Sequence, residues 1–411
     1  MSLAAISVAA LFVVIVVSCV TKLNVGVLAI AMAWLIGVYL GDFNVDQIAA
    51  GFPAQLFLTL VGMTLLFTQA QLNGTLEKLA HKAVLGCRGN AGLIPVMFFF
   101  LAAALASMGP GNIATAALIA PMAMATAGRA GVPAFLMAIM VGNGANAGSL
   151  SPFAPTGIIV NALMSRIGMP GLEWQTYVTI LLASAAVAFA GYALFGGPRL
   201  FRVQSEGAVE TVKDPFDRGN WITLAVIAAL LIGVVVFKIS VGMGAFAAAV
   251  ILAAVRAADH AESIRKIPWN VIVMVSGVTV LIALLEKTQG LALMTDLLAR
   301  VATKESVSAV VAFVTGVVSA YSSTSGVVLP AFLPVVPGLS NQLGADSTAV
   351  ALSMSVGATL VDVSPLSTIG ALCIASAPVD VDARKLFNAL LAWGLSMTVV
   401  GAALCFAFLR A

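Results

Sequence analysis

Residues 142–157 have the sequence GNGANAGSLSPFAPTG and lie in the middle of an otherwise apolar segment. A related stretch, SVGATLVDVSPLSTIG, occupies residues 355–370. Each stretch interrupts an apolar helix with small and polar residues and then continues with a Ser-Pro pair. Serine is a favoured N-cap, and proline fits the first helical position because its missing N–H needs no partner there. We therefore predict that a helix restarts at each pair. The two pairs are Ser151-Pro152 and Ser364-Pro365.

Composition indicates that these interruptions lie inside a membrane. Of the 411 residues, 61% are hydrophobic and only 9% are charged, whereas soluble proteins carry about 25% charged residues. Apolar runs recur at about the length of a transmembrane helix, roughly 17–25 residues, and they are too long for barrel strands. Irregular backbone at membrane depth is tolerated only where it is buried in protein or lines a wet cavity. We therefore predict an all-α polytopic membrane protein with its functional site at the interruptions.

The same composition excludes several classes of function. A net charge of +3 is too small to indicate a nucleic-acid partner. The two His and four Cys residues show no metal-ligand spacing, so no structural metal is expected. The interruptions contain no His and a single acid, so we expect no nucleophile–base pair and no enzyme. The sequence also has no Walker-type phosphate loop, so we expect no cofactor and no ATP hydrolysis by this chain.

The chain divides into two halves with the same order of elements. The first half contains spans at 3–20, 24–41, 53–72 and 173–195, an amphipathic segment at 75–85, a re-entrant hairpin at 93–127 and an interrupted helix at 133–166. The hairpin breaks at residues 107–112, SMGPGN, where Gly109, Pro110 and Gly111 have the composition of a turn. After a linker at 196–218, the second half repeats the order with a hairpin at 306–341 and an interrupted helix at 347–377.

Corresponding residues recur at a nearly constant spacing, which supports an internal repeat. Pro53, Gly62 and Thr64 return 215 positions later as Pro268, Gly277 and Thr279. Each repeat has five crossings when the hairpin is not counted, and this odd number makes the second repeat inverted. If each hairpin instead consisted of two complete spans, each half would have six crossings and the two halves would be parallel.

The Lys and Arg residues set the orientation of the inverted arrangement. With five crossings per repeat, most of them lie on the side reached after the first span. The exceptions are Arg166, Lys238, Lys287, Arg300, Lys304 and Arg410. The positive-inside rule then predicts that both termini are extracytoplasmic and that the 196–218 linker is cytoplasmic.

Helix ends at mid-membrane could hold ions of both signs. Helix N-termini offer free N–H groups and a positive dipole end, which suit an anion. The interruptions contain no Lys or Arg, so an anion would be held by these N-termini and by side-chain donors. The N-termini are expected near Asn112, Ser151, Ser325 and Ser364. Helix C-terminal ends and unwound carbonyls near 143–149 and 356–362 would suit a cation such as Na⁺.

Each polar residue in the interruptions could bind a ligand or could have only a structural role. Asp362 is the only carboxylate within an interruption, where it could ligate Na⁺, carry a coupling proton or merely stabilise the restarting helix. Asn143 and Asn146 could reach a ligand or could satisfy unwound backbone. The predicted substrate-binding residues are Asn112, Asn143, Asn146, Ser151, Pro152, Ser322, Ser323, Thr324, Ser325, Ser364, Pro365 and Thr368. The predicted ligands of a coupling cation are Asn112, Asn146, Ser149, Thr324, Thr359 and Asp362.

The sequence also resembles a known family. Residues 51–79, GFPAQLFLTLVGMTLLFTQAQLNGTLEKL, together with residues 146–155, resemble the bacterial dicarboxylate carriers of the MatC type, which are associated with malonate. The overall layout is similar to the divalent anion/sodium symporters of the ion transporter superfamily. In that superfamily each hairpin tip carries Ser-Asn-Thr and binds substrate carboxylate and sodium. The present tips, Gly111-Asn112-Ile113 and Ser322-Ser323-Thr324, each keep part of that pattern.

This resemblance implies a secondary active importer of a small dicarboxylate such as malonate, succinate or malate, driven by Na⁺ or H⁺ in the bacterial inner membrane. It further implies a homodimer and an elevator motion, in which residues 93–195 and 305–411 slide against a scaffold of residues 1–92 and 219–304. The alternatives are an exporter or exchanger of another small anion or metalloid, and an uncoupled anion channel.

Overall fold

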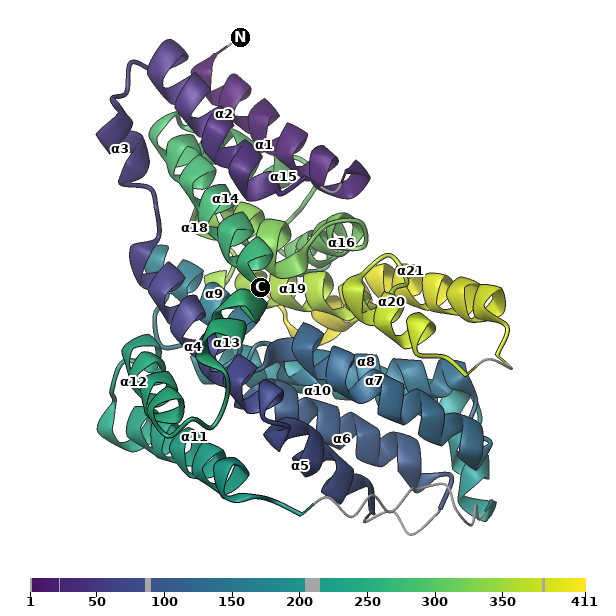
Figure 1. Cartoon of the computed structure of the whole chain (residues 1–411). Coiled ribbons are helices and arrows are strands. Elements are labelled where there is room, and N and C mark those ends of the chain that lie inside the picture. Colours follow the sequence, from purple (N-terminus) through teal and green to yellow (C-terminus); the bar gives the residue numbers. More distant parts are fainter. Residues whose placement is uncertain (1, 22, 86–89, 204–214, 379–380) are drawn as a thin grey trace.

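A computed structural model of the chain describes residues 2–21, 23–85, 90–203, 215–378 and 381–411 (Figure 1). Every regular element among these residues is a helix. Residues 204–214 of the 196–218 linker, which include Lys213, and the loop residues Lys22 and Arg88 lie outside the described residues. Eight helices in the described part of the chain are long and apolar enough to cross a membrane. The chain is therefore an all-α, multi-pass membrane protein.

The first half forms ten α-helices in the described ranges, close to the expected segments. They are α1 (Leu3–Val20), α2 (Val25–Leu40), α3 (Val45–Ala49), α4 (Ala54–Leu72), α5 (Thr75–Leu85), α6 (Leu93–Met108), α7 (Gly111–Ala130), α8 (Ala134–Ser149), α9 (Pro155–Arg166) and α10 (Glu173–Leu194). A short 3₁₀ helix, η1 (Gly197–Arg202), follows.

The second half has the same order of long helices. It contains α11 (Arg218–Phe237), α12 (Val241–Ala254), α13 (His260–Lys266), α14 (Trp269–Lys287), α15 (Gly290–Ala299), α16 (Val307–Ser319), η2 (Thr324–Val328), α17 (Leu329–Phe332), η3 (Leu333–Val335), α18 (Val336–Leu343), α19 (Ser347–Leu360), η4 (Val361–Val363), α20 (Thr368–Ala375) and α21 (Ala383–Phe408). In Figure 1, α1, α2, α14 and α15 form one group, and α6, α7, α8 and α10 form another.

Glycines at equivalent positions bring the two halves into close contact. A Cβ added to Gly62 of α4 would lie 2.6 Å from the Gly242 carbonyl oxygen of α12. A Cβ added to Gly277 of α14 would overlap the Gly26 carbonyl of α2. Small residues let helix backbones approach closely in a membrane. Each half therefore packs one of its own helices tightly onto a helix of the other half.

The break in the first hairpin forms where the sequence predicts it. The α6 helix ends at Met108 and α7 begins at Gly111. Gly109 has φ of 146°, which only glycine adopts readily, and a Cβ there would overlap the Phe67 ring of α4. The α7 helix has 20 residues, enough to cross a membrane by itself. The re-entrant path of this hairpin therefore stays a prediction.

The two Ser-Pro pairs do not begin helices, contrary to the sequence prediction. In the first interruption α9 begins at Pro155, with Ala154 as its N-cap; the Ser151 hydroxyl accepts from the Phe153 N–H and donates to the Ser107 carbonyl 2.7 Å away, so it closes a turn before the helix. In the second, α20 begins at Thr368 with Ser367 as its N-cap. Ser364 and the following proline precede that helix, and the Ser364 hydroxyl accepts from the N–H of Leu366. Proline does occupy the first position of α9, but it is a later proline than predicted.

Helix C-termini lie where the sequence predicts, at Ser149 and Leu360, but the unwound carbonyls begin later than predicted, after 149 in the first interruption and after 360 in the second. Residues 143–149 belong to α8 and residues 356–360 belong to α19, so their backbone is helical. The non-α-helical backbone covers residues 150–154 and 361–367. The sequence prediction was wrong because glycine-rich helices persist where close packing, here of Gly144 on Phe99 and Gly148 on Ala103, stabilises them.

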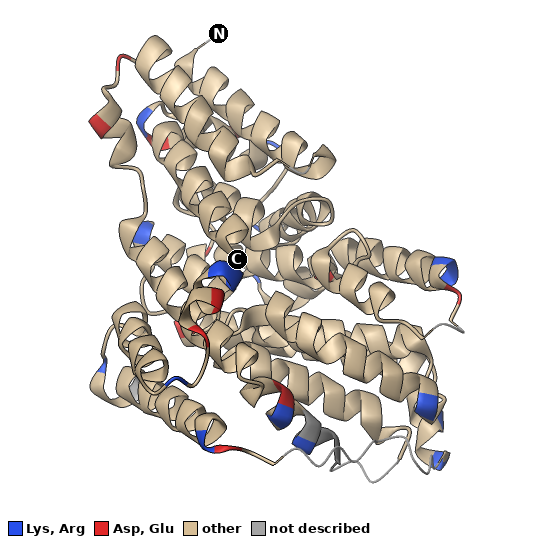
Figure 2. Ribbon diagram, in the orientation of Figure 1, with Lys and Arg blue, Asp and Glu red and all other residues tan. Residues whose placement is uncertain are grey.

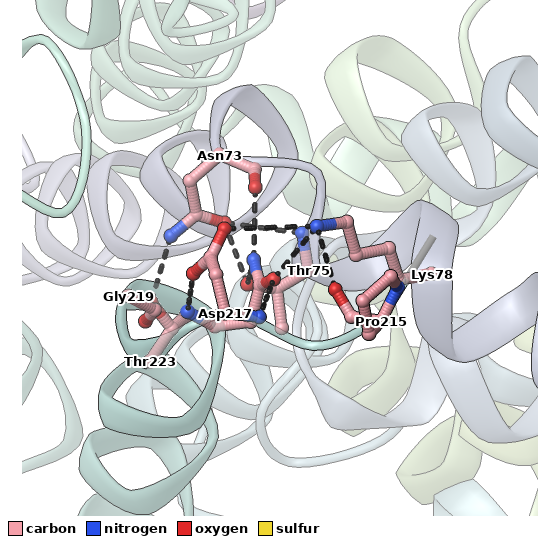
Figure 3. A network of polar contacts seen from close by, with 8 residues as sticks. Asn73, Thr75, Lys78, Pro215, Asp217, Gly219 and Thr223 are labelled. Atoms are coloured by element: carbon pink, nitrogen blue, oxygen red, sulfur yellow. Dashed lines mark hydrogen bonds and ion pairs between the residues drawn. The ribbon is translucent and has the colours of Figure 1, made fainter. Parts of the chain in front are cut away.

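Charged residues gather at helix ends and loops, and the long apolar segments between them carry few (Figure 2). One polar cluster ties the end of α4 and the start of α5 to the start of α11 (Figure 3). Asn73 Nδ2 donates to Thr223 Oγ1 at 2.7 Å, and Lys78 Nζ lies 3.0 Å from Asn220 Oδ1 and 3.6 Å from Asp217 Oδ2. The cluster therefore joins the first half to the second where the linker ends.

The backbone N–H of Asn220 donates to Asp217, which caps α11. This bond, assisted by the nearby Lys78 ammonium, holds the pKa of the Asp217 carboxyl below its ordinary value of 3.8.

Candidate functional site

Both hairpin tips and both interruptions meet at one cavity of about 230 Å³, which we call the central pocket. It is lined by Ser18, Asn112, Ile113, Ser149, Thr156, Tyr321, Ser322, Ser323, Thr324, Ser325, Thr359, Asp362, Leu366, Ser367, Thr368 and Ile369. No Lys or Arg side chain is among these described lining residues. The pocket is therefore polar, small and supplied with a single carboxylate.

The structure brings most of the predicted residues together. Those that line the central pocket are Asn112, Ser149, Ser322, Ser323, Thr324, Ser325, Thr359, Asp362 and Thr368. Asn146 lies directly behind the pocket wall: Asn112 Nδ2 donates to Asn146 Oδ1 at 3.0 Å, and Asn146 Nδ2 donates to the Thr359 carbonyl at 3.1 Å. Asn146 thus connects the first hairpin to the second interruption.

The other five predicted residues lie outside the pocket lining. Asn143 is fully buried and donates to the Ile139 carbonyl of its own helix at 2.8 Å. Ser151 is held by the Ser107 carbonyl, and Ser364 and Pro365 are buried before α20. Pro152 lines a separate cavity of about 620 Å³ beside Glu173 and Lys238. For these five residues, the sequence indicates a polar or turn-forming side chain near the site but does not determine whether that side chain points into the pocket.

Asp362 anchors a chain of hydroxyl groups. Thr324 Oγ1 donates to Asp362 Oδ1 at 2.6 Å, and Ser319 Oγ lies 2.6 Å from Thr324 Oγ1. Because a threonine hydroxyl has one proton, Ser319 is the donor in the second contact. The Asp362 carboxylate accepts from the second hairpin instead of capping α20, whose N-cap is Ser367. This geometry supports a ligand role for Asp362 over a capping role.

Thr359, three residues before Asp362, is a second oxygen-bearing residue of the central pocket. Its side chain is 1% exposed, and its Oγ1 has no hydrogen-bond partner in the described part of the chain. A buried hydroxyl without a partner costs free energy, so such a group indicates a missing ligand or water. Thr359 and Asp362 therefore offer oxygen atoms suited to a small hard cation.

The hydrogen-bond donors that could bind an anion come from the two hairpin tips. Ser323 Oγ accepts from the Gly326 N–H at 3.1 Å, which leaves its own proton free to point into the pocket. The N-termini of η2 and α7 lie at the two tips, near Ser325 and Asn112, as the sequence predicts. Thr156, which the prediction omitted, is the second residue of α9 and adds a third helix start at the pocket.

A second cavity lies next to the central pocket, and we call it the vestibule. Its volume is about 190 Å³, and it shares Asn112, Ile113, Thr156 and Ser325 with the central pocket. It extends between the C-terminal part of α4 and the start of α14, where Lys266 lines it. The vestibule therefore lies between the central pocket and the C-terminal part of α4.

Three further polar lining residues were not predicted from the sequence: Ser18, Tyr321 and Ser367, the N-cap of α20. Ser18 lies in the strongly apolar first span, where nothing in the local pattern distinguishes it from other helix serines. Tyr321 precedes the second tip and is 51% exposed. A search for polar residues next to the predicted tips would have found Tyr321, but no local signal would have found Ser18.

The comparisons with known proteins agree with this architecture. Residues 1–149 match the family model described as the dicarboxylate carrier protein MatC N-terminus, which confirms the resemblance over that range. No curated protein matches the chain.

Two solved transporters share the fold. The YdaH transporter of Alcanivorax borkumensis has 14% sequence identity and a TM-score of 0.62, covering 93% of this chain and 96% of its own. MtrF of Neisseria gonorrhoeae, from a class of antimetabolite efflux pumps, has 13% identity and a TM-score of 0.56, covering 91% of this chain and 84% of its own. The carrier family and the shared fold together indicate a membrane transporter and not an enzyme.

Proposed function

We propose that this transporter is a secondary active importer of a small dicarboxylate of the malonate, succinate or malate class, coupled to Na⁺ or H⁺ in a bacterial inner membrane. The match of residues 1–149 to a dicarboxylate carrier family supports the substrate class. The observation that carries the coupled mechanism is Asp362, a lone carboxylate in the lining of the central pocket, bonded to a neutral hydroxyl.

The anion would occupy the tip side of the central pocket. A volume of about 230 Å³ suits a small molecule and would exclude bulky ones. Helix starts at Asn112, Ser325 and Thr156 would direct N–H groups at carboxylate oxygens. The Ser323 hydroxyl would add a donor whose proton is not otherwise used.

The coupling ion would occupy the Asp362 side of the pocket. An ionised carboxylate taken out of water is expensive unless a cation or a proton compensates it. Thr324 Oγ1 is a neutral oxygen bonded to this carboxylate, and Thr359 Oγ1 is another neutral oxygen of the same pocket. With Na⁺ these three oxygens would be ligands. With H⁺, Asp362 would carry the proton itself.

We further propose an elevator motion of residues 93–195 and 305–411 within inverted repeats. The two tips meet the remaining helices at inequivalent positions: Gly109 lies against Phe67 of α4, and Gly326 lies against Met274 of α14. At the spacing of 215, Phe67 corresponds to Ile282 and Gly326 to Gly111, which is two residues after Gly109, so the tips are displaced from a symmetric arrangement.

In the opposite state of the transporter, each tip would take the position along its helix that corresponds to the present position of the other tip. The first tip would then lie near Thr59 and the second near Ile282, a shift of eight residues along each helix. At 1.5 Å per residue the moving segments would travel roughly 12 Å. Homodimer assembly and extracytoplasmic termini, which the sequence led us to expect, remain part of this proposal.

Uptake of labelled malonate into proteoliposomes tests the proposed function. The protein would be given an inward Na⁺ gradient, an inward H⁺ gradient or neither, with succinate, malate and citrate as competitors. Accumulation above equilibrium with one gradient would establish coupling and identify the ion. Equilibration that ignores both gradients would contradict coupled transport and favour a channel.

An exporter or exchanger is the second candidate, since the fold is shared with MtrF, which belongs to a class of efflux pumps. Vesicles preloaded with malonate distinguish the two directions. An exporter would empty them against an opposing malonate gradient, whereas an importer would not.

A further inference from the structure

Ser18 of α1 reaches the central pocket from the segment that we propose to be stationary. Its hydroxyl lies 2.6 Å from the Ser322 hydroxyl at the second hairpin tip and 2.9 Å from the Ile15 carbonyl of its own helix. Ser18 and Ser322 both line the central pocket. The two serines are 304 residues apart in the chain, and their contact joins the first span to the second hairpin.

The protons of these two hydroxyl groups fix the direction of both bonds. Each serine hydroxyl has one proton to donate and can accept at its oxygen. When Ser18 donates to the Ile15 carbonyl, Ser322 must be the donor to Ser18, and both bonds form. The reverse direction would sacrifice the bond to Ile15. The first arrangement therefore makes one more hydrogen bond and polarises the chain cooperatively.

In the favoured arrangement the Ser322 proton points at Ser18, away from the ligand. Ser322 Oγ then presents only lone pairs to the central pocket, and these repel the oxygens of a carboxylate. For Ser322 to donate to a bound carboxylate in this state, either its bond to Ser18 must break or Ser18 must turn its proton from Ile15 to Ser322, and one hydrogen bond is lost in both cases. Once the tip moves away from Ser18, the Ser322 proton becomes free at no such cost.

We propose that Ser18 is a positioning residue that withholds the Ser322 hydroxyl proton from an anionic substrate in this state of the transporter and releases it in the opposite state. The inference rests on the proposed function, since it assumes an anion in the central pocket and a tip that moves. Its consequence is a lower substrate affinity in the state in which the Ser18–Ser322 bond exists. Low affinity in one state favours release of the substrate there.

The size of the effect follows from the bond that must be given up. A neutral intramolecular hydrogen bond changes an equilibrium constant by about fivefold, since it contributes about 1 kcal/mol net. Ser18→Ala removes the competitor for the Ser322 proton, so we expect malonate to bind about fivefold more tightly. In a Ser322→Ala background there is no proton to release, and Ser18→Ala should then have no effect.

Binding of malonate to the purified full-length protein, measured by calorimetry at fixed Na⁺ concentration and pH, tests this cycle. Ser18→Thr, which keeps both the donor and the acceptor, should restore the wild-type affinity. Cys19→Ala changes a neighbouring exposed residue of the same helix and should leave affinity unchanged. A merely structural role of Ser18 would lower affinity or stability and would persist without Ser322.

The outcomes separate this inference from the proposed function. If the wild-type protein binds and transports malonate but Ser18→Ala leaves the affinity unchanged, the inference is overturned and the proposed function stands. The same holds if Ser18→Ala has equal effects with and without Ser322. If the wild-type protein neither binds nor transports any dicarboxylate, the proposed function and the inference both fail.

Discussion

Replacement of Asp362 by Asn tests the coupling mechanism most directly. The carboxylate is the only one among the described lining residues of the central pocket, and its hydrogen bond comes from Thr324 at 2.6 Å. Asn has nearly the same shape and can still accept from Thr324, but it neither binds a proton at neutral pH nor neutralises Na⁺. The variant should therefore keep its fold and lose coupling.

The magnitude follows from the number of carboxylates. One carboxylate supports one coupled ion, and a tenfold ion gradient supplies about 1.4 kcal/mol per ion. With the membrane potential clamped at zero, the wild-type protein should concentrate malonate about tenfold. Asp362→Asn should at most equilibrate it, so the accumulation ratio should fall to about one.

The assay is accumulation of labelled malonate in proteoliposomes, with the Na⁺ and H⁺ gradients applied separately. Asp346→Asn is a matched control, because Asp346 is the N-cap of α19 outside the pocket and Asn caps helices equally well. It should accumulate malonate like the wild type. Tenfold accumulation by Asp362→Asn, with unchanged ion dependence, would refute the reasoning.

Three further predictions concern the first tip and the polar cluster. Asn112→Ala should raise the KM for malonate uptake roughly tenfold, by loss of one hydrogen bond to a charged group; an unchanged KM would remove the first tip from the site. Gly109→Ala should lower thermal stability, because its φ of 146° costs about 1–3 kcal/mol for other residues and the new methyl group overlaps Phe67. Phe67→Ala should recover part of that loss, and a fully stable Gly109→Ala protein would contradict the turn geometry described above. Because the pKa of Asp217 is lowered in the folded protein, its stabilising effect is present above the ordinary value of 3.8 and is lost as pH falls through the folded pKa. Thermal melting between pH 6 and pH 3 should show this loss in the wild type and not in Asp217→Asn; identical profiles would disprove it.

The positions of the helices were predictable because membrane crossing imposes length and composition on the sequence. The turn at Gly109 was predictable because glycine and proline restrict or free the backbone locally. In both cases the physical cause lies within a few residues of its effect, so a single stretch of sequence carries the signal.

The restart points of the broken helices were not predictable, because competing partners decide them. Ser151 accepts from the Phe153 N–H and donates to Ser107, a residue 44 positions earlier, and this pair of bonds fixes a turn that delays the start of α9 to Pro155. Asn143 and Asn146 are one helical turn apart and equally polar, but only Asn146 meets the first tip and the second interruption. Ser18 was missed for the same reason, since its partner lies in the other half of the chain.

The glycine contacts between the halves have a consequence for biosynthesis. Gly62 of α4 packs on Gly242 of α12, and Gly26 of α2 packs on Gly277 of α14. The packing partners of these two glycines therefore both lie in the second half. When only the helices of the first half have left the ribosome, α12 and α14 are not yet available to pack on these two small-residue faces. The small-residue faces of α4 and α2 are packed only after α12 and α14 have been inserted. We therefore expect these two contacts to form late in synthesis, and a nascent chain that stops at the linker to leave both helix faces without their partners.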